Sequence, residues 1–185
     1  MIKSLFAFAI VLAFGIALTS NAAAQTKKRD SLTADEDEII REAQELDVRI
    51  RLYTKVIDRR FTVLNGGEIL ANPNKKQSKE EKKEAKESSL LGDLPTGTRA
   101  QLLSDISRNL DEARNKIDDV YQYDAKNPLV AKSLNNLAIA CERYLPQLKT
   151  ILANAKTEDE RENVASAIEI AESVVNAKTE AKTVK

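Results

Sequence analysis

The sequence predicts an all-α protein, a four-helix bundle with coiled-coil-like packing. Apolar residues recur at alternating three- and four-residue steps in four separate stretches, which is the spacing of one helix face. No alternation typical of a β-strand occurs after residue 25. Capping residues and turn residues separate the four stretches, and steps close to 3.5 residues favour helices that pack lengthwise around a shared core.

The first 24 residues have the pattern of a secretory signal peptide. Lys3 precedes an apolar run from Leu5 to Leu18, and small residues at 22–24 provide a cleavage site before Gln25. A membrane-spanning helix needs about 20 apolar residues, and this run is shorter. We therefore expect export to the periplasm or the extracellular space.

After cleavage the chain is expected to form one domain. Residues 25–34 have no periodicity and predict a flexible arm, residues 35–177 are long enough for one hydrophobic core, and residues 178–185 are expected to fray. One cysteine excludes a disulfide within the chain, and no Asn-x-Ser/Thr glycosylation site is present. Both features favour a bacterial protein over a eukaryotic one. No segment of the mature chain is apolar enough to predict a membrane span.

The first predicted helix covers residues 35–64. No glycine or proline interrupts it, and acidic residues crowd its first turn, where the helix dipole favours negative charge. Gly66 and Gly67 follow its end. Its apolar stripe is formed by Ile39, Ala43, Leu46, Ile50, Tyr53, Ile57, Phe61 and Leu64.

A charged connector is predicted over residues 68–94. Its centre, residues 75–87, is almost entirely Lys, Glu, Ser, Ala and Gln, so it lacks an apolar stripe that would fix it to a core. We expect a flexible, partly disordered linker. Its length gives a long crossover between the first and second helices, and it leaves their relative direction open.

Three further helices follow the connector. A capping box of Thr98 and Gln101 predicts a helix to about residue 121, and Asn127 with Pro128 starts the next. Pro146 lies inside this third helix, so we expect a kink near residues 142–146. The last helix starts at a second capping box. The apolar stripe of the second helix is Leu103, Ile106, Leu110, Ala113, Ile117 and Val120, and that of the third is Val130, Leu134, Leu137, Cys141, Tyr144, Leu148 and Ile151. The stripe of the last helix is Val164, Ile168, Ala171 and Val175.

The residue inventory argues against catalysis. The chain has no histidine and one cysteine, so the usual ligands of zinc and di-iron sites are missing and no base is at hand for a nucleophile. Basic and acidic residues are equal in number, at 29 each, which gives no basic footprint for nucleic acid. We expect no enzyme activity, no metal, no cofactor and no nucleic-acid partner.

Cys141 lies on the stripe of the third helix and is expected to be a buried free thiol. Apolar surroundings raise the pKa of a thiol and make it unreactive. The alternative is a disulfide between two molecules.

Three residues of the first helix are the candidate interaction site. Arg49 and Arg60 form a column with Tyr53 beside the apolar stripe, so both arginines are expected to be partly buried. A buried arginine needs a carboxylate partner. The column therefore indicates either pairing between helices or a site for an anion, and the candidate partners on the second helix are Asp105, Asp111, Asp118 and Asp119.

These observations lead to three functional hypotheses. The first is an exported, non-catalytic interaction or structural protein whose partner is an unknown protein or a second copy. The second is a helical bundle that binds an anion or small molecule through Arg49 and Arg60. The third is a membrane-surface or self-assembling protein that uses apolar surface outside the core.

Overall fold

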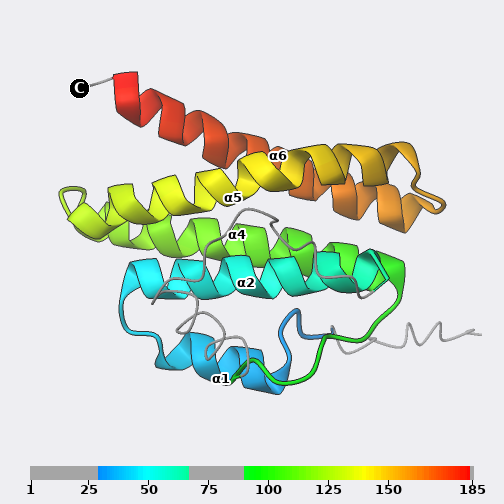
Figure 1. Ribbon diagram of the computed structural model, residues 1–185. Helices are drawn as coiled ribbons and strands as arrows, with labels where there is room; N and C mark the ends of the chain where they lie inside the picture. The colour runs from blue at the N-terminus through cyan, green and yellow to red at the C-terminus, as the bar shows by residue number, and fades with distance from the viewer. Residues whose placement is uncertain (1–28, 67–89, 184–185) are drawn as a thin grey trace, which may run out of the picture.

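The structure is a computed structural model that describes residues 29–66 and 90–183 (Figure 1). The signal peptide expected at residues 1–24 lies outside the described residues. Three further segments lie outside the described residues: the start of the arm at 25–28, residues 68–89 of the connector, and residues 184–185 of the tail.

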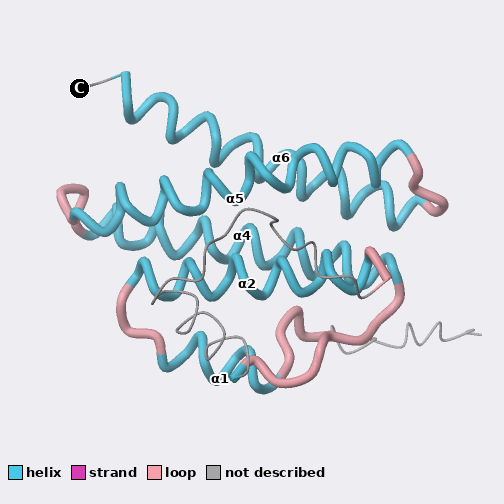
Figure 2. Tube along the Cα trace, viewed as in Figure 1, coloured by secondary structure: helices cyan, strands magenta, loops and turns pink. Residues whose placement is uncertain are grey.

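The described part of the chain is all-helical, and no strand occurs in it. Figure 2 shows that loops are confined to the ends and connections of the helices. This confirms the predicted all-α class. The five helices are α1 (Ala34–Glu42), α2 (Leu46–Leu64), α4 (Arg99–Tyr123), α5 (Pro128–Ala153) and α6 (Glu158–Thr183).

Four of these helices lie lengthwise beside one another, and α1 lies along one side of α2 (Figure 1). The most extensive contacts join α5 to α6 and α4 to α6, while α2 packs on both α4 and α5. The chain reverses direction between successive helices, so α1 is antiparallel to α2. This packing confirms a helical bundle.

The first predicted helix is broken in the structure, which gives five helices in the described ranges where four were expected. The helix α1 ends at Glu42, α2 begins at Leu46, and the backbone between them is extended at both Ala43 (φ −68°, ψ 103°) and Glu45 (φ −80°, ψ 134°). Helix propensity alone does not require this break, so the reason is tertiary. Folding α1 back buries its residues Glu36 and Ile40.

The other helix starts follow local capping signals. Thr98 and Gln101 form the capping box of α4, and the Asn127 side chain accepts from the Leu129 N–H at the start of α5. The helix α5 continues through Pro146, and the bend expected there remains a prediction. The helix α6 continues beyond Lys178 to Thr183 where fraying was expected, and Lys178 Nζ lies 2.9 Å from Glu142 Oε1 on α5.

One continuous hydrophobic core joins all five helices. Tyr144 is its largest apolar member without exposed surface, and its ring stacks on Phe61 of α2 with centroids 5.1 Å apart. Within the described residues, no helix combines the length and apolarity that crossing a bilayer requires. The valine, leucine and isoleucine side chains without exposed surface are those of Ile50, Val56, Ile57, Leu103, Ile106, Leu110, Leu137, Leu148 and Val164.

Candidate functional site

Glu36 is a completely buried carboxylate at the start of α1. It is the third residue of the helix, and its Oε2 accepts from the Thr33 N–H at 2.9 Å. In return, Thr33 Oγ1 accepts from the Glu36 N–H at 3.3 Å, which completes a capping box. The capping box therefore orients this carboxylate at the first turn of α1.

Arg60 of α2 forms a bidentate ion pair with Glu36. Its Nη1 lies 2.5 Å from Oε1 and its Nη2 lies 2.6 Å from Oε2, and only 1% of the arginine is exposed. Nη1 also donates to the Val56 carbonyl at 3.0 Å, and Nη2 donates to the Ser31 carbonyl at 2.6 Å. Planar guanidinium and carboxylate groups match in this geometry, so the pair is both strong and directional.

Arg59 adds a second guanidinium to the same carboxylate. Its Nε lies 3.1 Å from Glu36 Oε1, while its terminal nitrogens donate to the carbonyls of Gly92 and Asp93. One buried acid thus connects α1, α2 and the loop before α4.

The segment before α1 is held by a second group of contacts on α4. Arg29 Nη2 lies 3.1 Å from the buried Asp105 Oδ2, and Arg108 Nη1 donates to the Arg29 carbonyl at 2.6 Å. Ser31 and Asn109 exchange two hydrogen bonds, each of 3.2 Å. Residues 29–33 of the predicted arm therefore contact the bundle, and the flexibility expected for residues 25–34 stays a prediction. We call these side chains the N-terminal latch, or the latch: Arg29, Ser31, Glu36, Arg59, Arg60, Asp105, Arg108 and Asn109.

Asp105 is the residue of the latch whose charged form is destabilised by burial. Burial raises the pKa of Asp105, and the neighbouring Glu36 adds to this rise, while Arg29, Arg60 and Arg108 oppose it. A carboxyl whose pKa is higher in the folded than in the unfolded state stabilises the fold fully only when it is protonated. Stability from this group therefore falls as pH rises from the unfolded pKa through the folded one.

We predict that Asp105→Asn changes the pH dependence of stability. At a pH below the unfolded pKa of about 3.9, the free energies of unfolding of variant and wild type coincide, because the protonated acid resembles the amide. At pH 7 the variant is the more stable. Urea denaturation at both pH values measures the difference, and a wild type that gains on the variant as pH rises would contradict the prediction.

Arg49 and Tyr53 lie apart from the latch. Arg49 Nε and Nη2 donate to the Ala43 carbonyl at 3.0 and 2.7 Å, so this arginine caps the end of α1. Tyr53 is 3% exposed, and burial together with Glu112 raises its pKa to about 12. Arg60 lies at the other end of α1. The structure therefore does not assemble the three predicted residues into one site.

The carboxylate partner predicted for Arg60 was also wrong. Four aspartates of the second helix were the expected partners. Asp105 is near enough to Arg60 for an electrostatic interaction but forms its ion pair with Arg29, and Asp111 pairs with Arg114 on its own helix at 2.6 Å. The partner is Glu36, a residue of the same predicted helix. Its signal in the sequence was the Thr33-x-x-Glu36 capping pattern followed by two arginines on α2.

Cys141 is a free thiol without exposed surface. Burial, with a smaller effect of Glu142, raises its pKa to about 12. Thiolate is the reactive form, so alkylation requires the surrounding core to open.

We predict that Cys141 in the native protein reacts with iodoacetamide at pH 8 at least about a hundredfold more slowly than in guanidinium-unfolded protein. Mass spectrometry of quenched samples measures both rates. Equal rates would show that the thiol is accessible.

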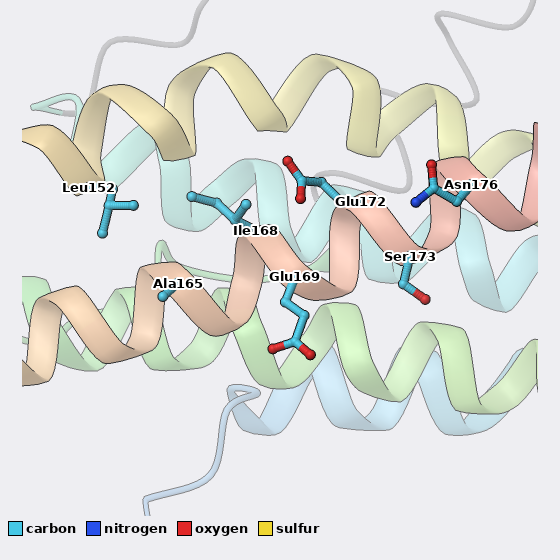
Figure 3. A pocket seen from close by; sticks show the side chains of 7 residues that line it. All are labelled: Leu152, Ala165, Ile168, Glu169, Glu172, Ser173 and Asn176. Atoms are coloured by element: carbon cyan, nitrogen blue, oxygen red, sulfur yellow. The ribbon is translucent and has the colours of Figure 1, made fainter.

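The hollows in the described part of the chain include two that α6 lines. The larger of these two, about 430 Å³, is an open depression along α5 and α6. Figure 3 shows Leu152 beside Ile168 at one end and Ser173 with Asn176 at the other. The smaller hollow, about 100 Å³, lies between α4, α5 and α6 and includes Arg114 and Leu137. None of the predicted site residues lines either hollow.

No group of three potential metal ligands occurs in residues 29–66 and 90–183. No protein-family model, curated protein or solved structure matches this chain. The fold and the site define an all-helical bundle whose first helix is fastened to the others by buried ion pairs.

Proposed function

We propose that this protein is an exported, non-catalytic helical protein with a structural or interaction role. The observation that supports this most is the closure of Arg60 by Glu36. Both terminal nitrogens of the Arg60 guanidinium donate to the two carboxylate oxygens of Glu36. An anion would have to displace Glu36, which has no exposed surface, from an arginine that is only 1% exposed.

The proposed location is the periplasm or the extracellular space. It depends on the charge, apolar run and small residues of positions 1–24. Expression of the whole chain in a bacterial host, followed by cell fractionation and N-terminal sequencing, tests this proposal. It requires a mature protein that begins at Gln25 outside the cytoplasm.

We also propose three details of the helical bundle: its packing, its crossover and a bend. The four long helices α2, α4, α5 and α6 are proposed to pack as in a coiled coil, because their apolar steps average about 3.5 residues. The connector between α2 and α4 provides the long crossover, and α5 bends near Pro146 because proline removes one helix hydrogen bond.

Self-assembly is the second candidate, and exposed apolar side chains favour it. Ile139 on α5 is 53% exposed, and Leu90 and Leu94 before α4 are 55% and 46% exposed. Single exposed apolar residues are ordinary on protein surfaces, so this support is weaker.

The test of the main proposal uses residues 25–185 and thermal melting with phosphate, citrate and matched sodium chloride. We expect equal melting temperatures at equal ionic strength, because Arg49 and Arg60 are engaged internally. A rise specific to phosphate or citrate that Arg49→Gln abolishes would favour the anion-binding alternative. Arg49 is the better probe, because replacing the fully buried Arg60 also unfolds the latch.

A further inference from the structure

The hinge between α1 and α2 has the sequence of a helix. Its three residues, Ala43, Gln44 and Glu45, include no glycine or proline, and all three residue types favour helix. The apolar stripe continues through the hinge from Ile39 to Ile50 in steps of four, three and four. A break therefore needs an external cause at this position.

Charge spacing also favours a continuous helix across the hinge. In an unbroken helix Glu45 lies four residues after Arg41 and four before Arg49, so it pairs favourably with both. In the folded-back chain Arg49 instead donates to the Ala43 carbonyl. Opening the hinge also lets the N–H groups of residues 44–47 bond to the carbonyls of residues 40–43.

The contacts that keep α1 folded back do not require the hinge to be closed within one chain. They join residues 29–43 to side chains of α2 and α4 and to the carbonyl of Thr96. A second copy of the chain presents the same docking surface. The isolated α1 has nine residues and is too short to be stable without such a surface.

We propose that the chain exchanges α1 with a second copy to form a domain-swapped dimer. In each chain residues 34–64 become one helix, and Glu36 of one copy pairs with Arg59 and Arg60 of the other. Because α1 is antiparallel to α2 in the closed chain (Figure 1), the two long helices lie antiparallel across a two-fold axis near the hinges. This deepens the proposed function by naming a second copy as the partner.

The dimer depends on concentration and on the hinge. Exchange preserves the latch contacts, adds helix hydrogen bonds and loses the Arg49 cap on Ala43. The association entropy opposes it, so the closed monomer is favoured at low concentration.

The first experiment compares two substitutions at one exposed hinge position. Glu45 has φ −80°, which proline adopts, so Glu45→Pro fits the closed hinge. Proline inside the continuous helix of the dimer removes a hydrogen bond and clashes with the preceding turn. Glu45→Ala removes the same carboxylate but favours helix.

Light scattering coupled to size-exclusion chromatography over a concentration series of residues 25–185 measures the dimer. We expect the wild type to dimerise and Glu45→Ala to dimerise within about tenfold of it, because the helix propensity of alanine offsets the lost pairs with Arg41 and Arg49. We expect Glu45→Pro to dimerise at least about a hundredfold more weakly than either. Monomers at every concentration for all three chains, or equal dimerisation of Glu45→Pro and wild type, would overturn the proposal. A strictly monomeric chain would leave the proposed function intact, because another protein could still be its partner.

A mixing experiment tests which residues meet in the dimer. The variants Glu36→Lys and Arg60→Glu each place like charges in their own latch. In a swapped pair of the two variants, the lysine introduced at position 36 of one chain would meet the glutamate introduced at position 60 of the other, while the second latch has the native pair. We expect dimers from the mixture and fewer from either variant alone. A mixture that gives no more dimer than its components would contradict the exchange, and if either variant fails to fold, the Glu45 series decides.

Discussion

Replacing Arg60 by methionine is expected to lower the free energy of unfolding by about 3–5 kcal/mol. The substitution removes the arginine that pairs with Glu36 in a bidentate geometry, and it leaves this carboxylate without exposed surface. Arg59 compensates only in part, because its Nε alone faces Glu36, at 3.1 Å, while its terminal nitrogens are bound to the carbonyls of Gly92 and Asp93. Urea denaturation followed by circular dichroism measures the change.

Two controls separate the unpaired charge from lost packing. The double variant Glu36→Leu with Arg60→Met removes both charges, and we expect it to recover most of the lost stability. The exposed pair of Arg41 with Asp37 provides the matched surface control, and Arg41→Ala is expected to cost less than about 0.5 kcal/mol. A double variant as unstable as Arg60→Met would show that packing and not charge is responsible.

We also expect the latch to determine which part of the bundle opens first. The nine-residue α1 depends on its docked position, since a helix of this length is marginal alone. We therefore expect Arg60→Met to lose amide protection over residues 29–42 before it loses protection in α5. Local opening of this kind would also be the first step of the exchange proposed above.

The helices α4 and α5 were predictable because their starts depend on neighbouring residues. The Thr98 box and the Asn127–Pro128 start act within one turn of the chain, and the structure has both. Apolar steps of three and four then determine which face is buried, as at Leu103 and Leu148. Such information is local and can be read from the sequence.

The hinge and the latch were not predictable in this way. Helical periodicity identifies a buried face but not the surface that covers it, so residues 35–64 were expected to form one helix. The partner of Arg60 was sought on the next helix, whereas folding back places Glu36 beside it. Arg49 was likewise expected to pair with an acid and instead caps α1 at the Ala43 carbonyl.

Tyr144 is the residue whose replacement should most weaken the core between α2 and α5. It has no exposed surface, its ring stacks on Phe61, and its hydroxyl donates to the Thr54 carbonyl at 3.0 Å. The Arg143 guanidinium lies 5.1 Å from the ring centroid and also pairs with Asp58. One side chain thus combines packing, stacking and a buried hydrogen bond.

We expect Tyr144→Ala to lower the free energy of unfolding by about 3–5 kcal/mol, because it leaves a large cavity. Tyr144→Phe keeps the ring and is expected to cost about 1 kcal/mol or less. Its cost is small because the Thr54 carbonyl lies within α2 and can still accept a helix hydrogen bond. Thermal and urea denaturation of both variants measure how the contribution divides between the ring and the hydroxyl.

Tyr123 provides the matched control, because it is 96% exposed at the end of α4. Tyr123→Ala is expected to change stability by less than about 0.5 kcal/mol. If Tyr144→Phe were as destabilising as Tyr144→Ala, the hydroxyl would dominate, and the stacking of Tyr144 on Phe61 would not be what holds α5 against α2. The opposite order, a large loss for alanine and a small one for phenylalanine, is the result that this packing requires.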